Sequence, residues 1–212
     1  YWASYSLLNA MLSLLKAANE AFDYKYYEEG LLRFNDLCNF MKIGIDTADV
    51  VTTVSKTYAQ EIQTPEYGEG LEMMLKYRNE DLYGIVNGID PDIWNPKTDK
   101  LIPANFSATS LANKAKCKAE LQKKYGLEVN ADIPLFGIVS RLVDQKGLDL
   151  IAAIAHEFKQ MPAQMIVLGS GDGWYENMFR NLGMNSNNIR DYIGYNAAEA
   201  EHIYSGADVF LM

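Results

Sequence analysis

Two cations, Arg141 and Lys146, flank a predicted strand-to-helix crossover in the second half of the chain. The continuous apolar run from Leu135 to Val139 is typical of a strand buried on both faces of a parallel sheet, and a helix is predicted to begin near Gly147. The N–H groups and the positive dipole end at a helix start attract anions. Because one cation follows the strand and the other precedes the helix, the pair is suited to hold a diphosphate from two sides. Two solvated surface cations would fit the spacing equally well.

Three further residues follow the next two predicted strands. Gly169 and Gly171 lie in a turn between strand 164–168 and helix 173–182, where glycines let the backbone approach a ligand closely. A plain tight turn is at least as consistent with their spacing. Tyr195 follows strand 189–193, where its ring can stack on a nucleotide base or cover the rim of the sheet. Ligands of open α/β sheets bind at the carboxyl ends of the strands, so all three residues would extend the candidate anion site.

The sequence favours a site without a metal ion or other cofactor. Asp90 and Asp92 resemble a pair of carboxylates that bridges Mg²⁺ or Mn²⁺ to a diphosphate, but Pro91 between them favours a structural turn. A site that holds two cations does not need a metal to neutralise a diphosphate. His156 and His202 have no catalytic partner in the pattern, and neither is expected to be catalytic.

The order of predicted elements indicates an α/β protein. The second half alternates strand 134–139, helix 147–159, strand 164–168, helix 173–182, strand 189–193, helix 197–204 and strand 208–212. This alternation is typical of a parallel sheet with crossover helices. Upstream, the sequence predicts helices at 1–22, 35–47, 57–62 (with Ser55 as N-cap) and 111–125 (with Ser110 as N-cap), and strands at 50–54, expected to be buried, and 83–86. A long proline-rich connection after Gly88 predicts two domains, 1–88 and 89–212.

Composition excludes several classes of protein. The net charge of −9 argues against a general nucleic-acid or anionic-membrane surface, and no apolar run approaches the roughly 18 residues that span a bilayer. Cys38 and Cys117 are far apart and show no metal-ligand spacing, which favours a reduced, cytoplasmic protein. The lysines of helix 111–125 are expected to form a solvated face; they are Lys114, Lys116, Lys118, Lys123 and Lys124. Because the chain begins at Tyr1 and ends inside an apolar run, we expect an internal piece of a longer enzyme with both domains incomplete.

Several motifs together resemble one family. SRLVDQKGLDL, GSGDGWYE, IGY and IYSGADVFLM occur in this order, preceded by ADVVTTVSKTYAQEIQTPEYGEGLE and YGIVNGIDPDIWNPKTD. From about Tyr26 to Met212 the chain resembles bacterial glycogen synthase and plant starch synthase. The resemblance implies the GT-B fold, in which two Rossmann-like domains face a cleft. It also implies transfer of glucose from ADP-glucose, with retention, to the non-reducing end of an α-1,4-glucan.

The resemblance also implies roles for single residues. Arg141 and Lys146 match the cations on the donor diphosphate, and we take them as the catalytic pair. Gly169 and Gly171 match the turn near the nucleotide, and Tyr195 matches the aromatic residue beside the adenine. These positions coincide with the residues that the strand ends and glycine turn suggest independently.

One more position matches the family, and other features depart from it. Asn87 matches the asparagine that faces the sugar cleft, whereas Glu201 and His202 stand where members more often carry His-Arg. The family's lysine- and glycine-rich loop, its cleft histidine and its C-terminal glutamate motif are absent. We therefore expect these 212 residues to bind part of a donor at best and not to elongate a glucan alone. The alternatives are another GT-B transferase that uses a UDP- or GDP-sugar, and a non-catalytic nucleotide-binding module.

Overall fold

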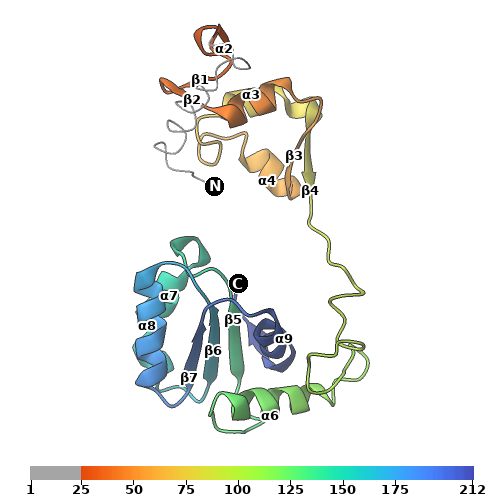
Figure 1. The fold of residues 1–212 in the computed structure, drawn as a ribbon, viewed down its shortest axis with the longest axis vertical. Coiled ribbons are helices and arrows are strands. Elements are labelled where there is room, and N and C mark those ends of the chain that lie inside the picture. The colour runs from red at the N-terminus through yellow and green to blue at the C-terminus, as the bar shows by residue number, and fades with distance from the viewer. Residues whose placement is uncertain (1–24) are drawn as a thin grey trace, which may run out of the picture. The chain divides into compact units, whose positions relative to one another are not determined.

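The computed structural model describes residues 25–212, and the helix predicted at 1–22 lies outside the described residues. The chain divides into two compact units, one that ends at Ile89 and one that comprises Asp90–Met212. Each contains a parallel sheet with helices (Figure 1). Within residues 25–212, none of the helices has both the length and the apolar character needed to cross a membrane.

The described part of the first unit contains a short hairpin, a two-stranded parallel sheet and small helices. In chain order these are α2 (Lys25–Glu28), β1 (Arg33–Phe34), β2 (Leu37–Cys38), α3 (Phe40–Thr47), β3 (Val51–Val54), α4 (Lys56–Glu61), α5 (Glu72–Tyr77), the 3₁₀ turn η1 (Asn79–Asp81) and β4 (Leu82–Ile85). Its apolar cluster centres on Ile62, Leu71 and Leu75. Ser55 caps α4, as predicted, by accepting a hydrogen bond from the Tyr58 N–H.

The helix predicted from residue 35 begins five residues later, at Phe40, because a hairpin occupies the intervening segment. Asn35 and Asp36 form its two-residue turn, with φ of 48° and 59°. Turns of this kind need left-handed backbone at both central positions, which Asn and Asp tolerate better than other residues with side chains. Asn39 then caps α3, since its side chain accepts a hydrogen bond from the Lys42 N–H at 3.0 Å.

The strand predicted at 50–54 forms as β3, but the prediction that it is buried is wrong. Its residues alternate between half-buried and exposed, and Val54 is 53% exposed. β3 pairs only with β4 among the described residues, with Val51 opposite Leu82. Successive side chains of a strand point to opposite faces of the sheet. When an apolar cluster packs against only one face, every second side chain stays exposed.

A buried arginine ties α3 to the rest of the first unit. The guanidinium of Arg78 donates hydrogen bonds to the carbonyl oxygens of Ile45 (2.6 Å) and Asp46 (2.9 Å) and to that of Ala48. These carbonyls lie at the C-terminal end of α3, where helix carbonyls lack partners within the helix. Arg78 therefore acts as a C-terminal cap supplied by a distant segment.

The second unit is a four-stranded parallel sheet covered by helices. Its elements are α6 (Lys114–Lys124), β5 (Leu135–Val139), the 3₁₀ turn η2 (Asp144–Lys146), α7 (Leu148–Phe158), β6 (Gln164–Gly169), α8 (Gly173–Met184), β7 (Ile189–Ile193), α9 (Ala197–Gly206) and β8 (Val209–Phe210). The strand order is β7-β6-β5-β8, and all pairs are parallel. The predicted strand–helix alternation is therefore confirmed.

The sheet of the second unit has an apolar layer on each face. On one face, Met165 and Val167 pack with Leu148 of α7 and Phe179 of α8. On the other face, the alternate residues of β6 and β5 pack with Leu121 of α6 and Ile203 of α9. All six residues of β6 are buried, which is why this strand reads as a continuous apolar run in the sequence.

Two predicted boundaries in the second unit need correction. The helix predicted at 111–125 spans Lys114–Lys124, and Ser110 does not cap it because its backbone exchanges two hydrogen bonds with Ser107. The strand predicted at 208–212 is limited to two residues, and Met212 is 98% exposed. The short pairing of β8 with β5 ends before the apolar run does.

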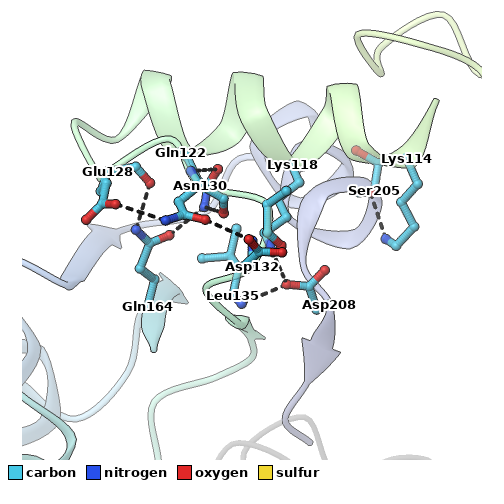
Figure 2. Close-up of polar contacts among 11 residues, drawn as sticks. Lys114, Lys118, Gln122, Glu128, Asn130, Asp132, Leu135, Gln164, Ser205 and Asp208 are labelled. Carbon is cyan, nitrogen blue, oxygen red and sulfur yellow. Dashed lines mark hydrogen bonds and ion pairs between the residues drawn. The ribbon is translucent and has the colours of Figure 1, made fainter. Parts of the chain in front are cut away.

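The prediction that the α6 lysines form a solvated face holds for Lys116, Lys123 and Lys124, which are exposed, but is wrong for Lys114 and Lys118 (Figure 2). Lys118 is 6% exposed, and its Nζ lies 2.7 Å from Asp208 Oδ2 and donates to the Ala131 carbonyl at 2.8 Å. Lys114 donates to the Ser205 carbonyl at 2.8 Å. These side chains lie along the contact of α6 with α9 and the start of β8, so tertiary packing converts part of the charged run into internal anchors.

A buried pair of glutamines holds the connection between α6 and β5 in the same region (Figure 2). The side-chain amide of Gln122 donates to Gln164 Oε1 at 2.8 Å and to the Asn130 carbonyl at 2.9 Å. Gln164 in turn donates to the Glu128 carbonyl at 2.8 Å. Both glutamines are at most 2% exposed, so each of these bonds satisfies a group that water does not reach.

Candidate functional site

Three loops of the second unit meet at the carboxyl edge of its sheet. They are the crossover between β5 and α7 (140–147), the turn between β6 and α8 (170–172) and the connection between β7 and α9 (194–196). Because β5, β6 and β7 are parallel neighbours, their carboxyl ends lie at one edge. Five of the six predicted site residues lie on these loops or at the strand end beside them.

Backbone hydrogen bonds join the first two loops on both sides of Arg141. The Ser140 N–H donates to the Leu168 carbonyl at 3.1 Å, and the Leu142 N–H donates to the Ser170 carbonyl at 3.0 Å. The Asp172 N–H returns a bond of 2.8 Å to the Leu142 carbonyl. Leu142 is fully buried, so the backbone of Arg141 is fixed while its side chain is exposed.

The two predicted glycines are required by this close approach of the loops. A Cβ atom on Gly169 would lie 2.0 Å from the Ser140 carbonyl oxygen, and one on Gly171 would lie 2.5 Å from that of Leu142. Real Cβ atoms do not approach backbone atoms this closely. These glycines therefore place the loop that carries Arg141, and their part in binding a nucleotide stays a prediction.

The start of α8 is already occupied by carboxylates of this chain. Asp172 caps the helix by accepting from the Trp174 N–H at 2.7 Å, and Glu176 accepts from the Gly171 N–H at 3.0 Å. The motif GSGDGWYE contains both acids, but their spacing alone does not show that they face the turn. A bound anion would have to displace them, which makes this helix start a poor anion site.

The start of α7 is different, because no side chain in the described part of the chain caps it. Its N-cap is Gly147, with φ of 65°, and Lys146 immediately precedes it. The carboxylate of Asp149 lies in the first turn of the helix. An uncapped helix start beside a lysine attracts an anion through its N–H groups, its dipole and the ammonium charge together.

Arg141 and Lys146 are exposed, and within residues 25–212 neither forms an ion pair or a side-chain hydrogen bond. Lys146 borders a hollow of about 870 Å³ together with Ser140, Gly147 and apolar residues of β5, α7 and the chain end. Arg141 does not line this hollow. The pair thus belongs to one crossover, with both charges free for a ligand.

Tyr195 lies on the third loop and is 87% exposed. The Gly194 N–H donates to the Gly169 carbonyl at 2.8 Å, which links this loop to the glycine turn. Asn196 follows as the N-cap of α9 and accepts a hydrogen bond from the Glu199 N–H at 3.1 Å. The tyrosine ring is therefore presented from backbone that is held on both sides.

Asn87 belongs to the first unit and lies two residues after the end of β4, with its side chain exposed. The other five residues belong to the second unit, and a role for Asn87 beside them stays a prediction.

The acidic turn at Asp90 has a structural function. Its Oδ1 accepts hydrogen bonds from the N–H groups of Asp92 (2.9 Å) and Ile93 (3.3 Å), the pattern of an Asx turn. Across the part of the chain that the structure describes, no group of three or more His, Cys, Asp or Glu side chains is arranged to hold a metal ion.

The two histidines make structural contacts. His156 is exposed and lies 3.1 Å from the Gln160 side chain. His202 lies 3.0 Å from Lys124 Nζ and 2.8 Å from the Leu101 carbonyl oxygen. Neither histidine lies on the three loops of the candidate site.

A phenol that the sequence analysis did not single out lies beside this site. Tyr175 of α8 is 4% exposed, and its hydroxyl donates to Asp144 Oδ1 at 2.6 Å. This hydrogen bond, assisted by burial and the negative charge of Asp144, raises the pKa of Tyr175 to about 12. The motif spacing could not reveal the contact, because 31 residues separate the partners.

We expect the raised pKa of Tyr175 to weaken the fold at alkaline pH. The unfolded phenol ionises near pH 10, whereas the folded one stays protonated to about pH 12. The contribution of the phenol is therefore complete below pH 10 and is lost as the pH rises towards 12. The urea-unfolding midpoint is measured at about pH 8.5 and at about pH 11. Its decrease between these two pH values should be smaller for Tyr175→Phe than for the unsubstituted protein. Equal decreases of the midpoint in the two proteins would show that the pKa of Tyr175 is not raised in the folded state.

Comparisons with known proteins agree on one family. A family model described as the starch synthase catalytic domain matches residues 10–77. The glycogen synthase of Clostridium acetobutylicum is 50% identical over 188 residues, which cover 88% of this chain and 39% of that protein. The glycogen synthase of Desulforudis audaxviator is 47% identical over 189 residues, which cover 89% and 38% respectively. The chain thus spans about 40% of the length of the curated relatives it matches.

A solved structure gives the same result. The catalytic domain of starch synthase IV from Arabidopsis thaliana, bound to ADP and acarbose, matches with a TM-score of 0.81 and 33% identity. The match covers 90% of this chain and 40% of that one. Together with the parallel sheets of both units, this likeness confirms the predicted α/β fold class of the GT-B type.

Proposed function

Since this chain belongs to the glycogen and starch synthase family, we propose that it works in the transfer of glucose from ADP-glucose to an α-1,4-glucan with retention. In this proposal residues 89–212 begin the nucleotide-sugar domain and residues 1–88 belong to the acceptor-side domain. The strongest support within the molecule is the crossover that presents Arg141 and Lys146, neither of them ion-paired within residues 25–212, beside a start of α7 that no described side chain caps.

The chemistry of the two cations fits the departure of a nucleoside diphosphate. As the glycosidic bond to ADP breaks, negative charge grows on the diphosphate, and fixed cations stabilise that charge more than the ground state. Arg141 offers a planar fork of donors, and Lys146 offers a compact charge. The leaving phosphate is the natural acceptor of the proton from the glucan hydroxyl, so the proposal needs neither a metal nor a separate general base.

The other predicted residues take supporting roles in this proposal. Tyr195 is exposed at the same sheet edge, where an adenine can stack on its ring. Gly169 and Gly171 keep the turn close enough for the two loops to join. Asn87 would face the sugar from the first unit. The ADP bound to starch synthase IV supports the choice of adenine over other bases.

We place the protein in the cytoplasm. Cys38 and Cys117 are both buried, and they lie far apart in the sequence without the close cysteine spacing of a disulfide-rich secreted domain. The proposed partners are ADP-glucose and an α-1,4-glucan, with no nucleic acid or membrane among them.

The test is a calorimetric titration of the full chain with ADP and, separately, with UDP. We expect ADP to bind more tightly than UDP, and Lys146→Ala to weaken ADP binding about tenfold by removing one charged donor. Lys123→Ala, an exposed lysine on α6, is the matched control and should leave the affinity unchanged.

Three results would count against the proposal. Equal binding of ADP and UDP would favour a transferase that uses another nucleotide-sugar. Absence of ADP binding by a folded chain would favour a non-catalytic module or a site elsewhere. Equal losses in Lys146→Ala and Lys123→Ala would show a general charge effect.

A further inference from the structure

The contact between Tyr175 and Asp144 joins α8 to the turn that ends in Lys146. Asp144 is the first residue of η2, and Lys146 is its last. Inside the turn, the Lys146 N–H donates to the Val143 carbonyl and the Gly147 N–H donates to the Asp144 carbonyl, both at 3.0 Å. These two bonds shape the turn, but they do not fix it to the rest of the unit.

A side-chain contact supplies that attachment. Among the described residues, Asp144 is the member of η2 whose side chain makes a hydrogen bond, and its partner is the Tyr175 hydroxyl at 2.6 Å. Tyr175 is held independently of the turn, since its ring belongs to the apolar cluster of α7 and α8 and packs edge-on against Trp174 at 4.9 Å. The hydroxyl is thus a fixed donor, and Asp144 is the group that it positions.

The same contact determines which group the Asp144 carboxylate pairs with. A carboxylate near a lysine tends to pair with it, and a paired ammonium is less available to a bound anion. The Tyr175 hydroxyl gives this carboxylate a neutral partner, and Lys146 has no ion pair within residues 25–212. The hydrogen bond therefore orients the turn and leaves the Lys146 charge free.

We propose that Tyr175 is a positioning residue of the donor site, which acts through Asp144 to hold the turn that presents Lys146 to a nucleoside diphosphate. This inference rests on the proposed function, because it assumes that Lys146 binds the diphosphate. Tyr175 itself touches neither the donor nor the acceptor.

The test is a double-mutant cycle on ADP affinity in the full chain, with Tyr175→Phe, Lys146→Ala and both together. Tyr175→Phe keeps the buried ring and removes the hydroxyl, and we expect it to weaken ADP binding about fivefold. In the Lys146→Ala background it should cause no further loss, because the group that it positions is gone. Tyr77→Phe, on an 84% exposed tyrosine of α5, is the matched control.

A second variant keeps the inference testable if Tyr175→Phe disturbs the fold. Asp144 is exposed, so Asp144→Ala should leave the fold intact. Removal of a negative charge near an anion site would by itself strengthen ADP binding. We expect the opposite, a loss similar to that of Tyr175→Phe, because the turn is released.

The outcomes separate this inference from the proposed function. If Lys146→Ala weakens ADP binding but Tyr175→Phe and Asp144→Ala do not, the positioning role is wrong and the donor site stands. Additive losses in the cycle would show that Tyr175 only supports the fold. If Lys146→Ala has no effect, the donor site is wrong, and the positioning role falls with it.

Discussion

Replacement of Gly169 by alanine is expected to destabilise the second unit by at least about 3 kcal/mol and to remove ADP binding. The added Cβ would lie 2.0 Å from the Ser140 carbonyl oxygen and 3.1 Å from a Leu142 side-chain carbon. Neither neighbour can yield easily, because the Ser140 backbone is bonded to β6 and Leu142 is fully buried. The strain must instead separate the crossover from the glycine turn, which displaces Arg141.

Gly173→Ala is the matched control for this prediction. Gly173 is the first residue of α8, and a Cβ atom added there would meet nothing within 4 Å. Alanine there should be neutral or stabilise the protein by up to about 1 kcal/mol, because glycine is the poorer helix former. Urea unfolding of both variants measures the difference. Similar stabilities would mean that the loops do not approach as closely as described.

Replacement of Lys118 by methionine is expected to lower the free energy of unfolding by about 3 kcal/mol. The methionine fills a similar volume but cannot bond the Asp208 carboxylate or the Ala131 carbonyl, which Lys118 contacts at 2.7 and 2.8 Å. Asp208 keeps its 2.8 Å hydrogen bond from the Leu135 N–H and is partly exposed, which limits the loss. The effect should appear in the urea-unfolding midpoint at low and high salt alike, because the lysine is screened little by solvent.

Lys116→Met provides the comparison on the same helix. Lys116 is exposed, so its replacement should change stability by no more than about 0.5 kcal/mol. If the two variants were equally stable, the α6 lysines would be a solvated face after all, as their spacing alone suggested.

Local pattern predicted much of the second unit. The buried strands at 135–139 and 164–169 were visible as apolar runs, because both faces of a central parallel strand are covered. The hairpin at 33–38 was not visible, because its two strands are only two residues long and the left-handed turn at Asn35 and Asp36 carries no glycine. Such short strands lack the period on which a strand prediction depends.

For the candidate site, local pattern was enough to predict which residue types follow which strands. Arg141, Lys146, Gly169, Gly171 and Tyr195 could be placed near one sheet edge, because parallel strands bring their carboxyl ends together. The contacts of each residue depend on how separate segments of the chain pack together. The fold turns the two glycines into spacers between loops and makes Lys118 an internal anchor. It also brings Tyr175 to Asp144, 31 residues away. Contacts of this kind depend on the distance between separate segments, and no local spacing encodes that distance.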